Sequence, residues 1–153
     1  MKAFRFSLEK ALDWRRIQLE LEEARYKQEL AALDGLDRQR AEVEASGIRA
    51  EIEVRGWTPI GSGDLQALGE YRLHVRSQEA EIARRRIVAA QKLAEQEKLM
   101  FDARRRFRLL ERLKERRLQD WTVERDRELE QIAAESFTAR WGRTHRPGQT
   151  RLT

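Results

Sequence analysis

The chain has 153 residues, 39% of them charged and 7% aromatic, with two prolines and no cysteine. This composition favours long helices over a thick hydrophobic core, and the missing cysteine excludes disulfides, a zinc ribbon and a thiol nucleophile. The net charge of +5 is small beside 59 charged residues, so both signs are mixed along the chain. No stretch approaches the roughly 18 apolar residues of a membrane span, and no signal-peptide run follows the basic start. We therefore expect a soluble, cytoplasmic protein.

A first helix is predicted from about residue 7 to residue 54. Ser7 is a suitable N-cap, and Glu9 places an acid in the first turn, where the helix dipole favours it. Apolar residues spaced by three, four or seven predict a buried face that changes frame in mid-helix, as in a coiled-coil stutter. The predicted face consists of Trp14, Ile17, Leu21, Ala24 and Ala31, followed in the new frame by Leu33, Leu36, Val43, Ala50 and Val54.

The loop at residues 55–63 is the one clear break, because it holds three glycines and a proline. A second helix is predicted from about residue 64, where Asp64 is a good cap, to about residue 138. Alternating steps of three and four along this helix, from Leu65 to Trp121, meet an apolar residue at eleven of seventeen positions. A narrow apolar seam on a charged helix is the pattern of a coiled-coil strand.

Two long helices joined by a short loop usually lie side by side and antiparallel. The expected fold is therefore all-α, a long two-helix antiparallel coiled coil over residues 1–141. With the loop centred near residue 60, position i faces position 120 − i. Residues 142–153 contain three arginines and no acid and are predicted to be a disordered basic tail. The core is expected where bulky residues of both helices meet, at Trp14, Ile17, Leu21, Met100, Phe107 and Leu110.

No group of residues favours catalysis. Glu70 and His74 share a helix face as half of a possible metal site, but no convincing further ligand stands nearby. Gly61-Ser62-Gly63 lacks the lysine and the preceding strand of a phosphate-binding loop. A solvated helix face and a turn are the expected roles of these residues. We predict no enzymatic activity, no cofactor and no metal.

Basic residues gather in the second half of the chain. Residues 64–153 carry 21 basic residues against 15 acidic ones, whereas residues 1–63 carry 11 against 12. The densest run, Arg104 to Arg108, is either a solvated flank of the coiled coil or an electrostatic surface for an acidic partner. Specific nucleic-acid recognition is not expected, since there is no aromatic stacking platform and no basic region followed by a zipper.

Four segments, with their order, spacing and the total length, carry a resemblance over residues 1–141: Phe4–Leu12, Leu65–Tyr71, Leu113–Trp121 and Glu128–Ala133. Together they resemble the flagellar export protein FliJ family and its relatives in virulence-type type III secretion. The resemblance implies a hairpin similar to the stalk subunit of rotary ATP synthases, at the centre of the hexameric export ATPase. It also implies coupling to the export gate membrane protein, contact with flagellar export chaperones and no catalytic residues. The expected location is the cytoplasm, peripheral at the inner membrane.

The stalk resemblance suggests which residues contact the ATPase ring. In the predicted register, the basic residues near the start of the first helix come level with Arg104–Arg106 and form a collar at the open end of the hairpin. The predicted ring-contacting residues are Arg15, Arg16, Arg104, Arg105, Arg106, Arg108 and Trp121. The alternative is a basic coiled-coil protein that binds nucleic acid or an anionic membrane surface. A purely structural spacer is the third hypothesis.

Overall fold

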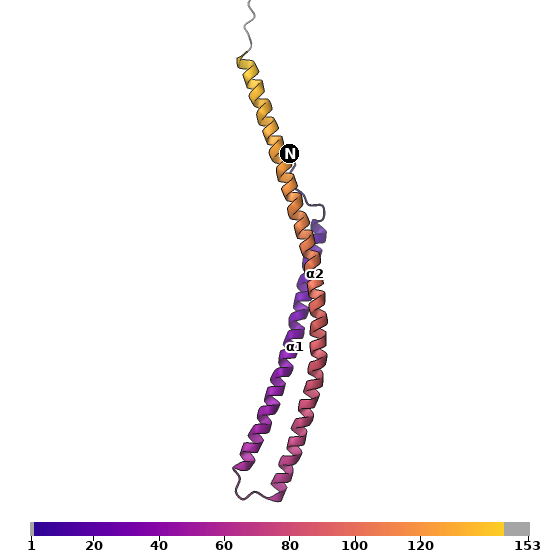
Figure 1. The fold of residues 1–153 in the computed structure, drawn as a ribbon, viewed down its shortest axis with the longest axis vertical. Helices are drawn as coiled ribbons and strands as arrows, with labels where there is room; N and C mark the ends of the chain where they lie inside the picture. Colours follow the sequence, from indigo (N-terminus) through magenta and orange to yellow (C-terminus); the bar gives the residue numbers. More distant parts are fainter. Residues whose placement is uncertain (1, 146–153) are drawn as a thin grey trace, which may run out of the picture. The chain divides into compact units, whose positions relative to one another are not determined.

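The chain consists of two helices, α1 (Glu9–Arg55) and α2 (Ser62–Thr144), joined by a short loop. This is a computed structural model that describes residues 2–145. The two helices pack against each other, as Figure 1 shows on either side of the loop, so the predicted all-α helical hairpin is confirmed. The chain divides into two compact units, here called the loop unit (Trp14–Arg106) and the terminal unit (Met1–Asp13 with Phe107–Thr153).

The helix that was predicted to start at Ser7 starts two residues later. Its first backbone bond runs from the Leu12 N–H to the Leu8 carbonyl at 2.9 Å, which makes Leu8 the N-cap rather than Ser7. Glu9 lies in the first turn as expected. At the other end, α1 reaches Arg55, one residue beyond the predicted end.

The cap of α2 has the form of half a capping box. The Gly61 carbonyl accepts the Leu65 N–H at 3.3 Å, so Gly61 is the N-cap. Asp64, which was predicted to hold that position, lies three residues further on, and its carboxylate accepts the Gly61 N–H at 3.0 Å. Asp64 therefore caps the helix through its side chain from inside the first turn.

α2 continues six residues beyond the predicted end at residue 138 and closes at Thr144. The prediction of disorder from Gly142 onward is therefore wrong for Gly142 to Thr144, His145 forms a turn after the helix, and residues 146–153 of that tail lie outside the described residues. The last turn contains Arg143, where a cation is favoured by the helix dipole. A single glycine this close to a helix end costs only about 1 kcal/mol of propensity, which did not justify ending the helix there.

The predicted seam of α2 is largely correct within the loop unit. Ile82 and Met100 are buried, each with 7% of its surface exposed. Leu65, which was predicted to start the seam, is 57% exposed. The half-buried members of the predicted seam are Leu68, Val75, Glu79, Ala89, Leu93, Gln96 and Ala103.

The predicted seam of α1 is wrong in its first part. Trp14, Ile17 and Leu21 are 52%, 60% and 42% exposed. The covered face instead starts at Leu12, which is 2% exposed, and keeps one heptad frame to the end of the helix without a stutter. The second part of the predicted seam belongs to this same frame and is confirmed. The covered residues in heptad steps of three and four are Leu12, Arg15, Leu19, Glu22, Tyr26, Glu29, Leu33, Leu36, Val43, Gly47, Ala50 and Val54.

The predicted register is confirmed to within three residues by side chains that pair across the two helices of the loop unit. Arg72 Nε contacts Glu51 Oε1 at 2.9 Å, and Arg86 Nε contacts Asp37 Oδ1 at 2.7 Å. The residue numbers of both pairs add up to 123, close to the predicted 120. In the terminal unit the Lys114–Glu9 pair, at 2.8 Å, gives the same value.

Little of the hairpin is fully covered, because two helices can bury only the side chains that face each other. Among residues 2–145 only Leu12, Ile82 and Met100 are buried, and no polar or charged residue is. Of the six residues predicted to form the core, Met100 is buried, and Phe107 and Leu110 are half-buried. The described part of the chain therefore offers broad surfaces rather than an enclosed site.

Candidate partner-binding surfaces

The loop unit carries a cleft on the outside of the hairpin that is lined by apolar side chains and by charges of both signs. Trp14 and Leu99, which are 52% and 52% exposed, line a cleft of about 170 Å³ together with Arg106. The guanidinium of Arg15 lies 4.7 Å from the centre of the Trp14 ring, within cation–π range. The remaining lining residues are Arg15, Gln18, Glu22, Asp102 and Ala103. The exposed Trp14 ring fits a partner that supplies an apolar group, whereas the two arginines and two acids of the lining give this cleft no net charge.

Sequence reasoning missed this surface because it placed the same residues in the core. Trp14, Ile17 and Leu21 lie at spacings of three and four, so they form one apolar ridge on the uncovered side of α1. The signal that distinguishes the two faces was present in the sequence. The frame that contains Leu12 continues by sevens through Leu33, whereas the frame that contains Trp14 does not.

The predicted ring-contacting arginines differ in their exposure to solvent and in their ion pairs. Arg104 is not freely available, since it pairs with Glu23 of α1 at 3.4 Å and lies 5.7 Å from the centre of the Phe101 ring. Arg105 and Arg106 are exposed and form no ion pair within residues 2–145. Arg15 is half-buried and Arg16 is exposed. Within the loop unit, Arg105 and Arg106 are therefore the best placed of the predicted set to meet an acidic partner.

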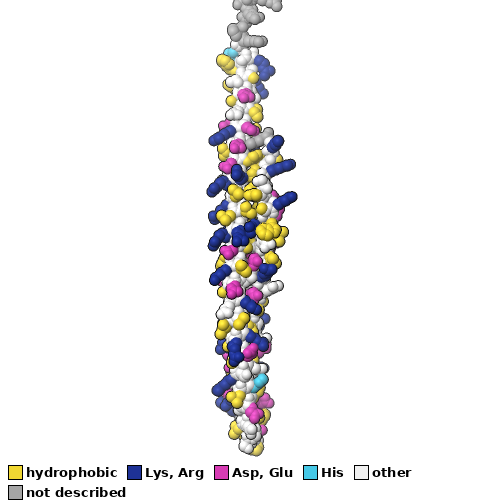
Figure 2. All heavy atoms as spheres, turned by 90° about the vertical axis from the view of Figure 1, so that its right-hand side faces the viewer, with side chains coloured by type: hydrophobic (Ala, Val, Ile, Leu, Met, Phe, Trp, Pro, Cys, Tyr) yellow, Lys and Arg dark blue, Asp and Glu magenta, His cyan; other side chains and the backbone are white. Residues whose placement is uncertain are grey.

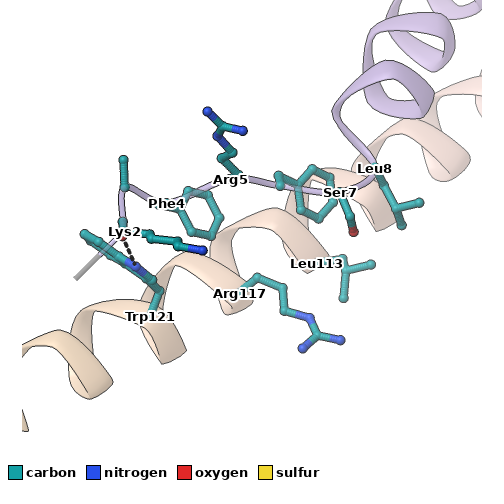
Figure 3. A pocket seen from close by; sticks show the side chains of 10 residues that line it. Lys2, Phe4, Arg5, Ser7, Leu8, Leu113, Arg117 and Trp121 are labelled. Atoms are coloured by element: carbon teal, nitrogen blue, oxygen red, sulfur yellow. Dashed lines mark hydrogen bonds between the residues drawn. The ribbon is translucent and has the colours of Figure 1, made fainter.

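In the terminal unit, the arm that precedes α1 lies along α2 (Figure 3). The Phe4 and Trp121 rings are 6.0 Å apart with their planes tilted by 56°, and the Trp121 indole N–H donates to the Lys2 carbonyl at 3.3 Å. Arg125 covers Trp121 at 5.2 Å from the ring centre. A cleft of about 970 Å³ lies between the arm and the Leu113–Trp121 stretch of α2. Trp121, predicted to contact a partner, is thus half-buried by the chain's own arm.

The terminal unit also contains exposed cations and an exposed length of helix. Arg108, the last of the predicted ring-contacting residues, is exposed and forms no ion pair within the described chain. Every residue from Asp126 to His145 is exposed, including the large side chains of Leu129, Phe137 and Trp141. Exposed apolar side chains in such number are typical of surfaces that bind something.

The electrostatic surface is mixed rather than uniformly positive. Figure 2 shows Lys and Arg side chains alternating with Asp and Glu, with hydrophobic side chains exposed between them. The hydrogen bond from Arg86 lowers the pKa of the Asp37 carboxyl, and the same bond raises the pKa of Arg86. Both groups are in solvent, so the pair adds little stability.

The described residues do not assemble a metal site. No group of three His, Cys, Asp or Glu residues comes together between residues 2 and 145. Glu70 accepts a hydrogen bond from Gln66 at 3.4 Å, and His74 lies in a shallow cleft beside Gln39 and Gln78. Over the same residues, neither helix has a segment long and apolar enough to span a bilayer.

Comparison of the chain with protein-family models, curated proteins and solved structures gives no match.

Proposed function

We propose that the chain is a non-enzymatic, stalk-like component of the flagellar type III export apparatus. In this role it binds the hexameric export ATPase, couples it to the export gate membrane protein and engages export chaperones in the cytoplasm, at the inner membrane. The proposal is supported by a contact between two of the segments that resemble the FliJ family. The segments Phe4–Leu12 and Leu113–Trp121, which resemble the FliJ family, contact each other through Phe4 and Trp121 and through Glu9 and Lys114.

The exposed cations support an ATPase partner. No acid among residues 2–145 pairs with Arg105 or Arg106, so their charge is available to an acidic ring lining. Charge attraction steers association and needs no fixed fit, which suits a stalk that adjusts within a ring. The neighbouring Trp14 adds an apolar contact that charge alone does not supply.

The test measures stimulation of a purified flagellar export ATPase by the full chain. The double reversal Arg105→Glu with Arg106→Glu is expected to weaken binding by about tenfold or more, and the loss should grow as salt is lowered. Arg104 is left in place because its reversal would also break the pair with Glu23. The matched control is Arg84→Glu with Arg85→Glu, which changes the net charge equally at residues that pair with Glu81 of the same helix.

Three results are distinguishable. Loss of stimulation in the Arg105/Arg106 variant with a normal control supports the proposal. Equal loss in both variants means that only net charge matters, which favours the alternative of a basic coiled coil for nucleic acid or anionic membranes. Retention of the chain on DNA or on anionic vesicles at physiological salt, with no binding to the ATPase, would contradict the proposed function.

A further inference from the structure

The exposed end of α2 carries an apolar ridge that nothing in the proposed function uses. Leu129, Ala133, Phe137 and Trp141 are spaced by four residues, which places them along one side of the helix. The three large side chains are 56%, 68% and 57% exposed, and Ala133 is exposed as well. We call these four residues the terminal ridge.

The Ser136 and Thr138 hydroxyls beside the terminal ridge are already bonded within the helix. The Ser136 hydroxyl donates to the Ile132 carbonyl at 2.7 Å, and the Thr138 hydroxyl donates to the Ala134 carbonyl at 3.0 Å. Covering this part of α2 would therefore leave neither hydroxyl without a partner. Burial of a polar group is unfavourable chiefly when its hydrogen bond is lost, so this surface is suited to being covered.

The charges on this length of helix are divided along its axis. Residues 124–135 contain five acids and two arginines, a net charge of −3, whereas residues 136–145 contain two arginines and no acid, a net charge of +2 with His145 neutral. A second copy in the antiparallel direction, centred on Ala133, would place the acid-rich residues 124–130 against residues 136–142 of its partner, which carry Arg140 and no acid. A parallel copy would place like charges together, which is unfavourable.

We propose that the terminal ridge is the interface of an antiparallel homodimer, with a second copy of this chain as its occupant. The small side chain of Ala133 lies at the centre, where the two helices approach most closely. Leu129 of each copy then lies against Phe137 of the other. Asp126, which pairs with Arg125 of its own helix at 2.8 Å, lies opposite Arg140 of the other copy and can accept from both. Leu129 and Phe137 stand four residues on either side of Ala133, so each faces the other in an antiparallel pair, and Trp141 of one copy comes level with Arg125 of the other. The proposal does not depend on the proposed function.

The absence of cysteine from the chain makes a direct test possible. A disulfide requires two Cα atoms within about 7 Å, so Ala133→Cys should cross-link to itself rapidly under mild oxidation. Leu129→Cys alone should not, but a mixture of Leu129→Cys and Phe137→Cys proteins should form mixed dimers. The matched control is Ala134→Cys, an exposed neighbour on another side of the helix, which should cross-link slowly.

Sedimentation equilibrium of the full chain supplies the affinity. Phe137→Glu should raise the dimer Kd at least tenfold, whereas Leu73→Glu, an exposed residue of the loop unit, should leave it unchanged. Asp126→Arg and Arg140→Asp should each weaken the dimer about fivefold, and the double variant should restore it because the pair is reversed rather than lost.

Three outcomes would overturn the proposal. The chain could remain monomeric at the highest soluble concentration, which would leave the ridge to a different partner. Ala133→Cys could cross-link no faster than Ala134→Cys, which would place the contact elsewhere. Leu129→Cys could cross-link to itself as fast as Ala133→Cys does, which would indicate a parallel arrangement.

Discussion

The stretch of α2 around Met100 and the stretch after Trp121 have similar compositions but very different burial. In the loop unit, α1 covers one side of α2, so Met100 is 7% exposed while its neighbour Leu99 is 52% exposed. From Asp126 onward no side of α2 is covered, and Phe137 is 68% exposed. In a two-helix hairpin, a side chain is therefore buried only where the other helix faces it. Apolar residues outside the seam remain available to partners.

The largest expected effect is a loss of stability when a buried seam residue is truncated, compared with truncation of an exposed residue on the uncovered end of α2. Met100→Ala should lower the free energy of unfolding by about 3 kcal/mol, because it removes a buried side chain and leaves a cavity. Phe137→Ala should change it by less than about 0.5 kcal/mol, since an exposed side chain loses little on truncation. Urea denaturation of dilute protein, followed by circular dichroism, measures both. Equal costs for the two variants would mean that the two stretches are covered alike.

A smaller effect concerns two glycines of α1, one of which, Gly47, lies beside Val75 of α2. An Ala Cβ at Gly47 would meet the Val75 side chain at 3.4 Å, an ordinary contact, and nothing lies within 4 Å of one at Gly35. Both Gly47→Ala and Gly35→Ala should therefore stabilise the chain by up to about 1 kcal/mol through helix propensity. Thermal melts of both variants check this. A Gly47→Ala variant that melts lower than the unmodified chain would show that the helices lie closer, or in another register.

The smallest expected effect is a pH dependence from the pair of Arg86 with Asp37. The pKa of Asp37 is lowered by the hydrogen bond from Arg86, so the pair contributes stability above the unfolded-state pKa. That contribution is lost as the pH falls through the folded-state pKa. Arg86→Gln should lower the melting temperature slightly near neutral pH and not at all in strong acid. Arg76→Gln, at an exposed residue without an ion pair in the described chain, is the control and should show no such change.

The fold and the candidate surfaces differ in how far they follow from sequence. The break at residues 55–63 and the seam through Ile82 and Met100 were predictable, because glycine, proline and apolar spacing act locally. The pairing of Arg104 with Glu23 was not, because it depends on which side of α1 faces α2. The same is true of Trp121, whose partner Phe4 lies over a hundred residues away in the chain.

Sequence by itself determined two long helices, their antiparallel pairing, the register to within three residues and the seam of α2. Tertiary structure decided which face of α1 is covered. Two faces competed, one with Trp14, Ile17 and Leu21, the other with Leu12, Leu19 and Tyr26 interrupted by Glu22 and Glu29. The first face is the more hydrophobic, so the sequence predicted that it would be covered. The second is covered in the structure, where Gln96 of α2 donates hydrogen bonds to the backbone carbonyl and the carboxylate of Glu22, so a polar residue is accommodated in the seam. The apolar periodicity of α1 describes that helix alone, whereas the pairing of Gln96 with Glu22 depends on residues of both helices.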